Sequence, residues 1–185
     1  MLLVFRSFAH VVFEDSNQRN FRSTQTECYN MADIPSLYDW AGGMPAFEKL
    51  TDVFYKKVLN DELLNPVFQH MSSKHQLHVA HFIAEVFGGP DTYSTSEGSH
   101  FQMIQKHLSK HLTEKHRKRW VELLIESADE INLPDDPEFR SAFVAYIEWG
   151  TRIAVLNSNS TSVDANENEP MPKWGWGVPG GPYGS

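Results

Sequence analysis

Residues 136–156 read DPEFRSAFVAYIEWGTRIAVL, and this stretch points to a helical fold. Asp136 is a residue type that caps helix N-termini, and Pro137 suits a first helical turn, where its missing N–H is not needed. The pattern then continues without a break to about Leu156. We therefore predict a long helix from Pro137 to about Leu156.

Apolar residues elsewhere in the centre of the chain also recur at helical rather than alternating spacing. The first predicted helix, over about 44–59, follows Gly42-Gly43, has Pro45 in its first turn and carries one apolar stripe: Phe47, Leu50, Phe54 and Val58. A turn around 61–65 follows, and Pro66 interrupts this turn before Val67 and Phe68.

Two further helices are predicted between these two. The segment HQLHVAHFIAEVF at 75–87 is stopped by Gly88-Gly89-Pro90 and carries an apolar side: Leu77, Val79, Phe82, Ile83 and Val86. The next helix starts at the cap residue Thr113 and directs Trp120, Leu123, Leu124 and Ala128 inward. Residues 90–113 are expected to be loosely structured, with a short helical piece over 101–107. No strand pair is visible, so the predicted fold class is all-α.

The composition fits one domain of ordinary size. The chain has 185 residues, 41% hydrophobic content and a formal net charge of −8. Nucleic-acid binding needs a basic face, so this charge argues against it, and we interpret the basic run at 116–119 as a solvated helix face. No apolar run approaches the roughly 20 residues that span a bilayer. Cys28 is the only cysteine, which excludes a disulfide framework and makes a reducing cytoplasm the expected location.

We expect the folded domain to span residues 33–157, between two flexible tails. Residues 1–32 are interpreted as a poorly ordered N-terminal extension, whose opening MLLVFRSFAHVVF is a poor signal or transit peptide. Residues 158–185 are rich in Ser, Asn, Pro and Gly and have little aliphatic content to bury, so a disordered tail is predicted. Its Trp174, Trp176 and Tyr183 could form a small sticky motif, but on a Gly/Pro-rich tail we interpret them as aromatic residues of an unstructured segment.

Three histidines lie close together in the stretch FQMIQKHLSKHLTEKHRKRW at 101–120: His107, His111 and His116. His107 and His111 have the spacing at which two imidazoles on one helix can bind one zinc ion. However, Ser109 and the cap residue Thr113 indicate that the helix ends near His107. Spacing alone does not choose between a metal site and three solvated histidines.

Short motifs between Ser36 and Asn157, about two-thirds of the chain, occur in an order and at separations typical of one family. They are SLYDWAGG at 36–43, FYKKV at 54–58, NPVF at 65–68, FGGP at 87–90, Tyr93, MIQKH ending at His107, RW at 119–120 and LPDDPEFRSAFVAYIEWGTRIAV at 133–155. Each motif is weak alone, but together they are specific. The chain resembles a group II truncated haemoglobin.

The resemblance implies a two-over-two helical sandwich around a haem and assigns the iron ligand to His107. His111 and His116 fall on positions that need no metal. Such a ligand is a neutral imidazole, whose second nitrogen donates to a backbone carbonyl and fixes the ring. The chain has no C-x-x-C-H motif, so the expected cofactor is haem b, held without thioether bonds.

The resemblance also implies which residues face the ligand. Tyr55 and Trp120 match the family's distal tyrosine and tryptophan, whose O–H and N–H groups donate to dioxygen. His75 matches a position that commonly faces the ligand, and Val79 lies one turn further along the same helix. The remaining haem contacts expected from the resemblance are Phe68, Phe82 and Lys106. Lys106 either pairs with a haem propionate or stays solvated.

The expected function is reversible binding of dioxygen and other small diatomic ligands. The same donors can support nitric-oxide dioxygenation or peroxidase-like turnover if electrons are supplied. Nothing in the chain resembles a flavin or nicotinamide domain, so an electron-donor reductase would be a separate protein. The alternative outside this class is a histidine-rich zinc-binding or purely structural helical module.

Overall fold

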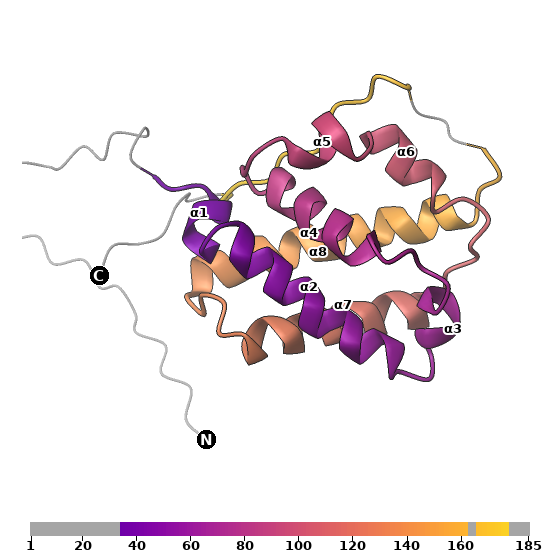
Figure 1. Cartoon of the computed structure of the whole chain (residues 1–185), viewed down its shortest axis with the longest axis horizontal. Helices are drawn as coiled ribbons and strands as arrows, with labels where there is room; N and C mark the ends of the chain where they lie inside the picture. The colour runs from indigo at the N-terminus through magenta and orange to yellow at the C-terminus, as the bar shows by residue number, and fades with distance from the viewer. Residues whose placement is uncertain (1–33, 163–165, 178–185) are drawn as a thin grey trace, which may run out of the picture.

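The computed structural model describes residues 34–162 and 166–177, which form helices and no strands (Figure 1). The long helices are α2 Met44–Leu59, α4 His75–Val86, α7 Glu114–Glu130 and α8 Pro137–Ser158. The short ones are α1 Leu37–Ala41, α3 Asn65–Phe68, α5 Thr92–Ser96 and α6 His100–Gln105. The predicted all-α class is confirmed. Residues 1–32 and Tyr183, interpreted above as parts of the tails, lie outside the described residues.

The helix starts follow from the local capping chemistry. At α8, the Asp136 carboxylate accepts the N–H of Phe139 at 2.8 Å. At α7, Thr113 and His116 form a reciprocal capping box, because the Thr113 hydroxyl accepts the N–H of His116 and His116 Nδ1 accepts the N–H of Thr113. His116 is therefore occupied as a helix cap. The predicted starts of the long helices are confirmed.

The four long helices pack as two crossing pairs (Figure 1). Helix α2 packs against α4 and α7, and α7 packs against α8. The core between them is aromatic and aliphatic, and its largest fully buried side chains include Phe47, Phe54, Phe87, Phe139, Phe143, Leu50 and Leu124. Full burial of one such side chain stabilises the fold by about 1.5–3 kcal/mol.

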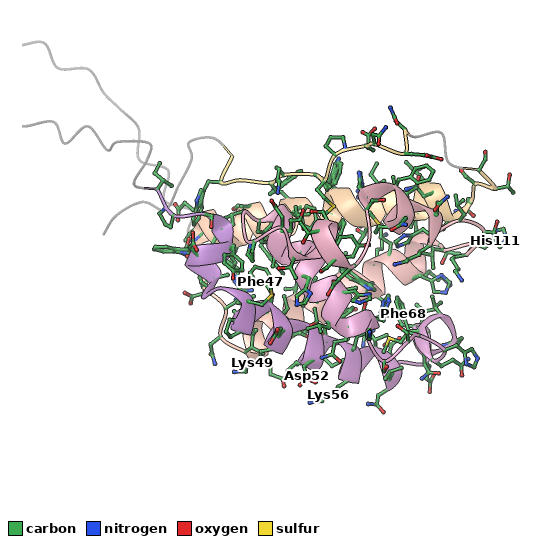
Figure 2. All side chains as sticks on the ribbon, turned by 45° about the horizontal axis from the view of Figure 1, so that its top comes forward. Phe47, Lys49, Asp52, Lys56, Phe68 and His111 are labelled. Atoms are coloured by element: carbon green, nitrogen blue, oxygen red, sulfur yellow. The ribbon has the colours of Figure 1, made fainter. Side chains whose placement is uncertain are left out.

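Helix α2 shows how the sequence pattern sets this packing (Figure 2). Phe47 is 1% exposed and points into the interior, whereas Lys49, Asp52 and Lys56 project outward. Lys56 pairs with Asp52 at 2.6 Å across one turn, but both side chains are exposed, so this ion pair adds little stability. The apolar stripe, rather than surface charge, therefore orients the helix.

One local prediction was wrong. Leu77 was placed on the inward side of α4, but its residue is 42% exposed, because it lies in the first turn of the helix, away from the core. The turn before Pro66 gives way to the short helix α3, and Pro66 lies at the start of that helix. A proline is tolerated there since the first turn has no use for its missing N–H.

The prediction of a disordered segment after residue 158 does not hold for residues 171–176. Trp174 and Trp176 are half-buried against the core. The indole N–H of Trp174 donates to the carbonyl of Ala142 at 3.0 Å, and that of Trp176 donates to the carbonyl of Pro35 at 2.7 Å. Aromatic rings, rather than aliphatic side chains, attach this segment. The domain boundaries themselves stay a prediction.

The glycines after α4 have a steric role. The N–H of Gly89 donates to the carbonyl of Ala84 at 2.9 Å, which brings the chain close to its own helix. A Cβ atom on Gly89 would lie 2.6 Å from the Tyr38 ring and 2.8 Å from that same carbonyl oxygen. Only glycine allows this approach. None of the helices in residues 34–162 and 166–177 is long and apolar enough to cross a bilayer.

We predict that Gly89→Ala lowers the free energy of unfolding by about 1–3 kcal/mol, because the added methyl group forces α4 and the Tyr38 ring apart. The matched control is Gly175→Ala, since a Cβ at Gly175 meets nothing within 4 Å. Urea unfolding followed by circular dichroism measures both. Equal stability of the two variants would contradict the close packing at Gly89.

Candidate functional site

A cavity of about 720 Å³ lies among the long helices and is lined mostly by apolar side chains. All eight residues singled out from the sequence contribute to its wall: Tyr55, Phe68, His75, Val79, Phe82, Lys106, His107 and Trp120. They come from α2, α3, α4, α6 with its following turn, and α7. The structure therefore brings these residues to one place, whereas their individual roles stay a prediction.

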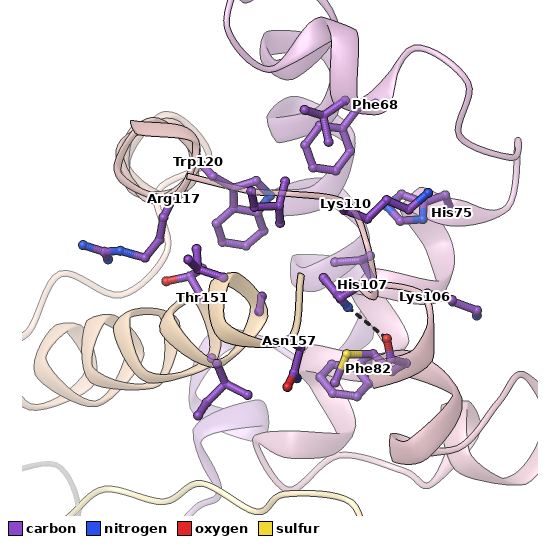
Figure 3. A pocket seen from close by; sticks show the side chains of 18 of the residues that line it. Phe68, His75, Phe82, Lys106, His107, Lys110, Arg117, Trp120, Thr151 and Asn157 are labelled. Atoms are coloured by element: carbon purple, nitrogen blue, oxygen red, sulfur yellow. Dashed lines mark hydrogen bonds between the residues drawn. The ribbon is translucent and has the colours of Figure 1, made fainter. Parts of the chain in front are cut away.

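His107 follows directly after the short helix α6 (Figure 3). Its Nδ1–H donates to the carbonyl of Met103 at 2.9 Å, which leaves Nε2 as the nitrogen with a free lone pair. Burial lowers the pKa of His107, and the nearby Lys110 and Lys106 lower it further, against the opposing effect of the bond to Met103. The ring is thus neutral near pH 7, the form that binds a metal ion.

The turn after His107 is held by the end of α8. Ser109 and His111 have positive φ angles of 56° and 51°, which non-glycine residues rarely adopt. The N–H of Ser109 donates to Ser160 and that of His111 to Ser158, at 3.1 and 3.0 Å. The buried Ser158 hydroxyl also accepts the N–H of Leu112. These bonds stabilise a backbone that would otherwise be strained.

This turn separates His111 from the cavity. His111 is exposed and lies at the edge of the molecule (Figure 2), so His107 and His111 do not share a helix face. Within the described parts of the chain, no group of three or more His, Cys, Asp or Glu side chains could hold a metal ion. A zinc site built from the neighbouring histidines is therefore not present among those residues.

The opposite wall carries a hydrogen-bonded pair. The Tyr55 hydroxyl and His75 Nε2 lie 2.9 Å apart, and the two rings meet edge to face. Burial raises the pKa of Tyr55, so its hydroxyl stays protonated. Burial also lowers the pKa of His75, and the positive charge of Lys106 adds to this effect. Both groups are neutral hydrogen-bonding partners near pH 7.

Aromatic packing fixes the rest of this wall. Trp120 packs edge to face on the buried Phe54, with ring centroids 4.8 Å apart. Phe68 contacts Tyr55 in the same manner at 5.9 Å, and Phe82 contacts Tyr93 at 5.1 Å. Because edge-to-face contacts restrict ring orientation, these side chains form a stiff surface.

The margin of the cavity is basic. Lys106 and Lys110 are exposed beside His107, and neither makes an ion pair with another described residue. No Asp or Glu contributes to the cavity wall in the described structure, although the whole chain carries a net charge of −8. The rim is therefore suited to negatively charged groups.

Several residues of the wall were missed by sequence reasoning, among them Arg117, Trp149 and Pro172. The run at 116–119 was interpreted as a solvated face, which is wrong for Arg117, a residue only 5% exposed. Its guanidinium donates to Glu114 and Glu148, both at 2.9 Å, and thereby links α7 to α8. The spacing of Glu114 and Arg117 predicts their pairing within α7, but not the burial of Arg117.

Comparison with known proteins agrees with this geometry. The bacterial-like globin family model matches residues 36–148, more than half of the chain. A group 1 truncated hemoglobin of Nostoc commune is 36% identical over 91 residues, which cover 43% of this chain and 77% of that protein. The chain belongs to the bacterial-like globin family. The expected resemblance to truncated haemoglobins is confirmed, and the protein is a haem-binding, oxygen-binding globin.

Solved structures show the same fold. The hemoglobin of the thermophilic phototrophic bacterium Chloroflexus aurantiacus is 28% identical, with a TM-score of 0.58 over 65% of this chain and 97% of that chain. The group II truncated hemoglobin of Bacillus anthracis is 21% identical, with a TM-score of 0.60 over 70% of this chain and 95% of that chain. The predicted two-over-two truncated globin fold is confirmed.

The residues of this globin's cavity fit a haem. The cavity offers one neutral imidazole with an uncommitted nitrogen, flat aromatic and aliphatic walls, and a basic margin for two propionates. Its volume of about 720 Å³ lies within the range of roughly 300–1,000 Å³ that is usual for ligand pockets. The donor set therefore matches the group that the family implies.

The bond between Arg117 and Glu148 predicts a pH effect on stability. The Arg117 guanidinium holds the pKa of Glu148 below its ordinary value of 4.5. A lowered folded-state pKa stabilises the protein above the unfolded pKa, and this contribution is lost as the pH falls through the folded pKa. Glu148→Gln should therefore cost about 1 kcal/mol at pH 7, with a difference that shrinks below about pH 4.

Thermal unfolding between pH 3 and pH 7 tests this effect. The control is Glu122→Gln, which removes a more exposed ion pair with Arg119 and should change stability by less than about 0.5 kcal/mol. A difference between wild type and Glu148→Gln that persists unchanged at pH 3 would show that the bond does not depend on the carboxylate charge.

Proposed function

We propose that this globin holds haem b non-covalently through His107 and binds dioxygen reversibly as an oxygen-binding protein of the cytoplasm. The supporting observation is the hydrogen bond from His107 Nδ1–H to the Met103 carbonyl, because it fixes the tautomer and leaves Nε2 for the iron. When bound, the haem iron supplies reversible coordination of diatomic ligands and one-electron chemistry. A separate reductase protein is the proposed electron donor.

The remaining wall residues would hold the haem by shape and charge. Phe68, Phe82 and Val79 provide apolar contacts, and all three line the cavity. Lys106, which is exposed at the margin and unpaired among the described residues, would pair with a propionate. Such an exposed pair would contribute less than about 1 kcal/mol, so apolar contacts and the axial bond carry most of the affinity.

Tyr55 and Trp120 are the proposed donors to dioxygen, and His75 is the proposed donor to Tyr55. A neutral His75 can either accept the Tyr55 proton at Nε2 or donate its own Nε2–H to the Tyr55 oxygen. Only the second arrangement leaves the Tyr55 O–H free for a ligand. We propose this chain of donors, from His75 to Tyr55 to dioxygen, because a donor that also accepts a hydrogen bond is polarised and strengthened.

The assignment of the iron ligand predicts opposite results for two neighbouring histidines. His107→Ala should lose most of the haem or bind it exchangeably, because the axial bond is removed. His111→Ala should keep a normal Soret band, because His111 lies outside the cavity. The measurement is the haem-to-protein ratio after purification. If only His111→Ala lost haem, the match to the truncated haemoglobin motifs would be shifted by one helical turn, and His111 rather than His107 would be the iron ligand.

The donor assignment predicts faster release of dioxygen from Tyr55→Phe and Trp120→Phe. A hydrogen bond to a partly charged acceptor is worth about 1.5–3 kcal/mol, or roughly 10- to 100-fold in rate. The double variant should lose more than the two single effects combined, since each donor partly replaces the other. Carbon monoxide, which carries less negative charge when bound, serves as the control and should be released at nearly unchanged rates.

His75→Leu tests the direction of the bond between His75 and Tyr55. If His75 donates to Tyr55, the variant should release dioxygen moderately faster than wild type, and less fast than Tyr55→Phe. Slower release would show that His75 accepts the Tyr55 proton in the wild type. Unchanged release in all three variants would overturn the assignment of the donors and leave the role of His107 intact.

A further inference from the structure

Burial alternates along residues 172–176 of the segment 171–176. Pro172, Trp174 and Trp176 are half-buried, whereas Lys173 and Gly175 are exposed. This period of two is typical of an extended chain that lays one side on a surface. In Figure 1 the yellow segment runs past α6 and α5 toward α1. Met171 also packs against the core, and the exposed Lys173 contacts Glu85 and Asp91.

The contacts of the segment fall at two separate places. At the first, the backbone N–H of Trp174 donates to Val86 at 2.8 Å and its indole donates to Ala142, so this residue joins the end of α4 to α8. At the second, the Trp176 indole donates to Pro35 and its ring meets Trp40 edge to face. Each tryptophan thus has one indole hydrogen bond and at least one aromatic partner.

Only the first place reaches the cavity. The Trp174 ring lies 5.7 Å, between centroids, from both Tyr146 and Trp149. These two residues of α8 line the cavity, and so does Pro172 of the segment. Trp40 and Pro35, the partners of Trp176, are not part of the cavity wall. The two tryptophans are therefore alike in chemistry, but only Trp174 contacts residues of the cavity wall.

We propose that Trp174 is a positioning residue of the haem pocket, which holds Trp149 and Pro172 in the wall and thereby slows loss of the haem. Trp149 is 41% exposed on α8 and contacts both Tyr146 and Trp174. Without the Trp174 ring, one side of Trp149 would have no aromatic neighbour there, and Pro172 would lose an anchor two residues along the chain. This inference rests on the proposed function, because it assumes that the cavity holds the haem.

Trp174 could instead act only by attaching the segment to the fold, and Trp176 provides the matched control. Both substitutions to alanine remove one indole hydrogen bond from the same segment, together with two aromatic contacts at Trp174 and one at Trp176. A purely structural role predicts that both variants lose haem equally fast. A positioning role predicts that the Trp174 variant loses haem faster than the Trp176 variant. This difference should not depend on how the two substitutions change the melting temperature of the haem-free protein.

The experiment measures transfer of ferric haem from the full-length protein to excess apomyoglobin, followed by absorbance. Trp174→Ala should lose haem about tenfold faster than wild type, and Trp176→Ala within about twofold of wild type. Trp174→Phe, which keeps a ring beside Trp149 but lacks the indole N–H, should restore most of the slow rate. Trp174→Leu keeps an apolar side chain and replaces the alanine variant if that protein does not fold.

A double-variant cycle identifies the route of the effect. If Trp174 acts through Trp149, Trp149→Ala with Trp174→Ala should lose haem no faster than Trp149→Ala alone. Three results would overturn the inference. The Trp174 and Trp176 variants could lose haem at equally raised rates, or Trp174→Ala could lose haem no faster than wild type. In the third, the double variant would show the sum of the two single effects on the rate of haem loss. The proposed function fails separately, if His107→Ala keeps its haem.

Discussion

The cavity between the helix pairs is the constraint on which the rest of the structure depends. The cavity of about 720 Å³ is lined mostly by apolar side chains and opens to solvent at a basic margin. Apolar side chains that face water forgo about 25 cal/mol of stabilisation per Å² of surface left uncovered. A flat apolar cofactor that covers these side chains therefore stabilises the helices around it. The aromatic walls and the basic margin suit such an occupant.

The two sides of the cavity are built differently. The proposed donors Tyr55 and Trp120 stand on the long helices α2 and α7, where the core residue Phe54 packs against both rings. His107 stands instead just after a six-residue helix, in a turn whose backbone is held by the end of α8. A rigid donor wall suits a fixed ligand geometry, because hydrogen bonds to a small ligand depend on position within fractions of an ångström. On the side of His107, the bond to the Met103 carbonyl in the short helix α6 orients the imidazole, and no long helix is needed for this.

The long helices could be predicted because their ends carry strong signals, such as Asp136-Pro137 before α8 and Gly88-Gly89 after α4. Of the short helices, α6 was expected as a helical piece over 101–107, whereas α1, α3 and α5 lack a periodic apolar stripe and were missed. Spacing could not separate His107 from His111, since the decisive fact is the left-handed turn between them; the resemblance to a family supplied the choice. The approach of Tyr55 to His75 and the burial of Arg117 depend on which helices meet, and no local pattern encodes that.

The C-terminal segment was misjudged because composition counts aliphatic residues, whereas here two indoles provide the burial. Two tryptophans bury about 300–500 Å² when fully covered, or at most about 7–12 kcal/mol, and ordering six residues costs about 6–12 kcal/mol. The net free energy of docking is close to zero. Docking of the segment therefore depends on both indoles and on the stability of the residues that they contact. Trp149 and Tyr146 are such partners, and both also line the cavity. By linkage, if the docked segment raises the affinity for haem by some factor, haem must favour the docked segment by the same factor. Haem binding and docking of the segment are then coupled equilibria, and each one favours the other.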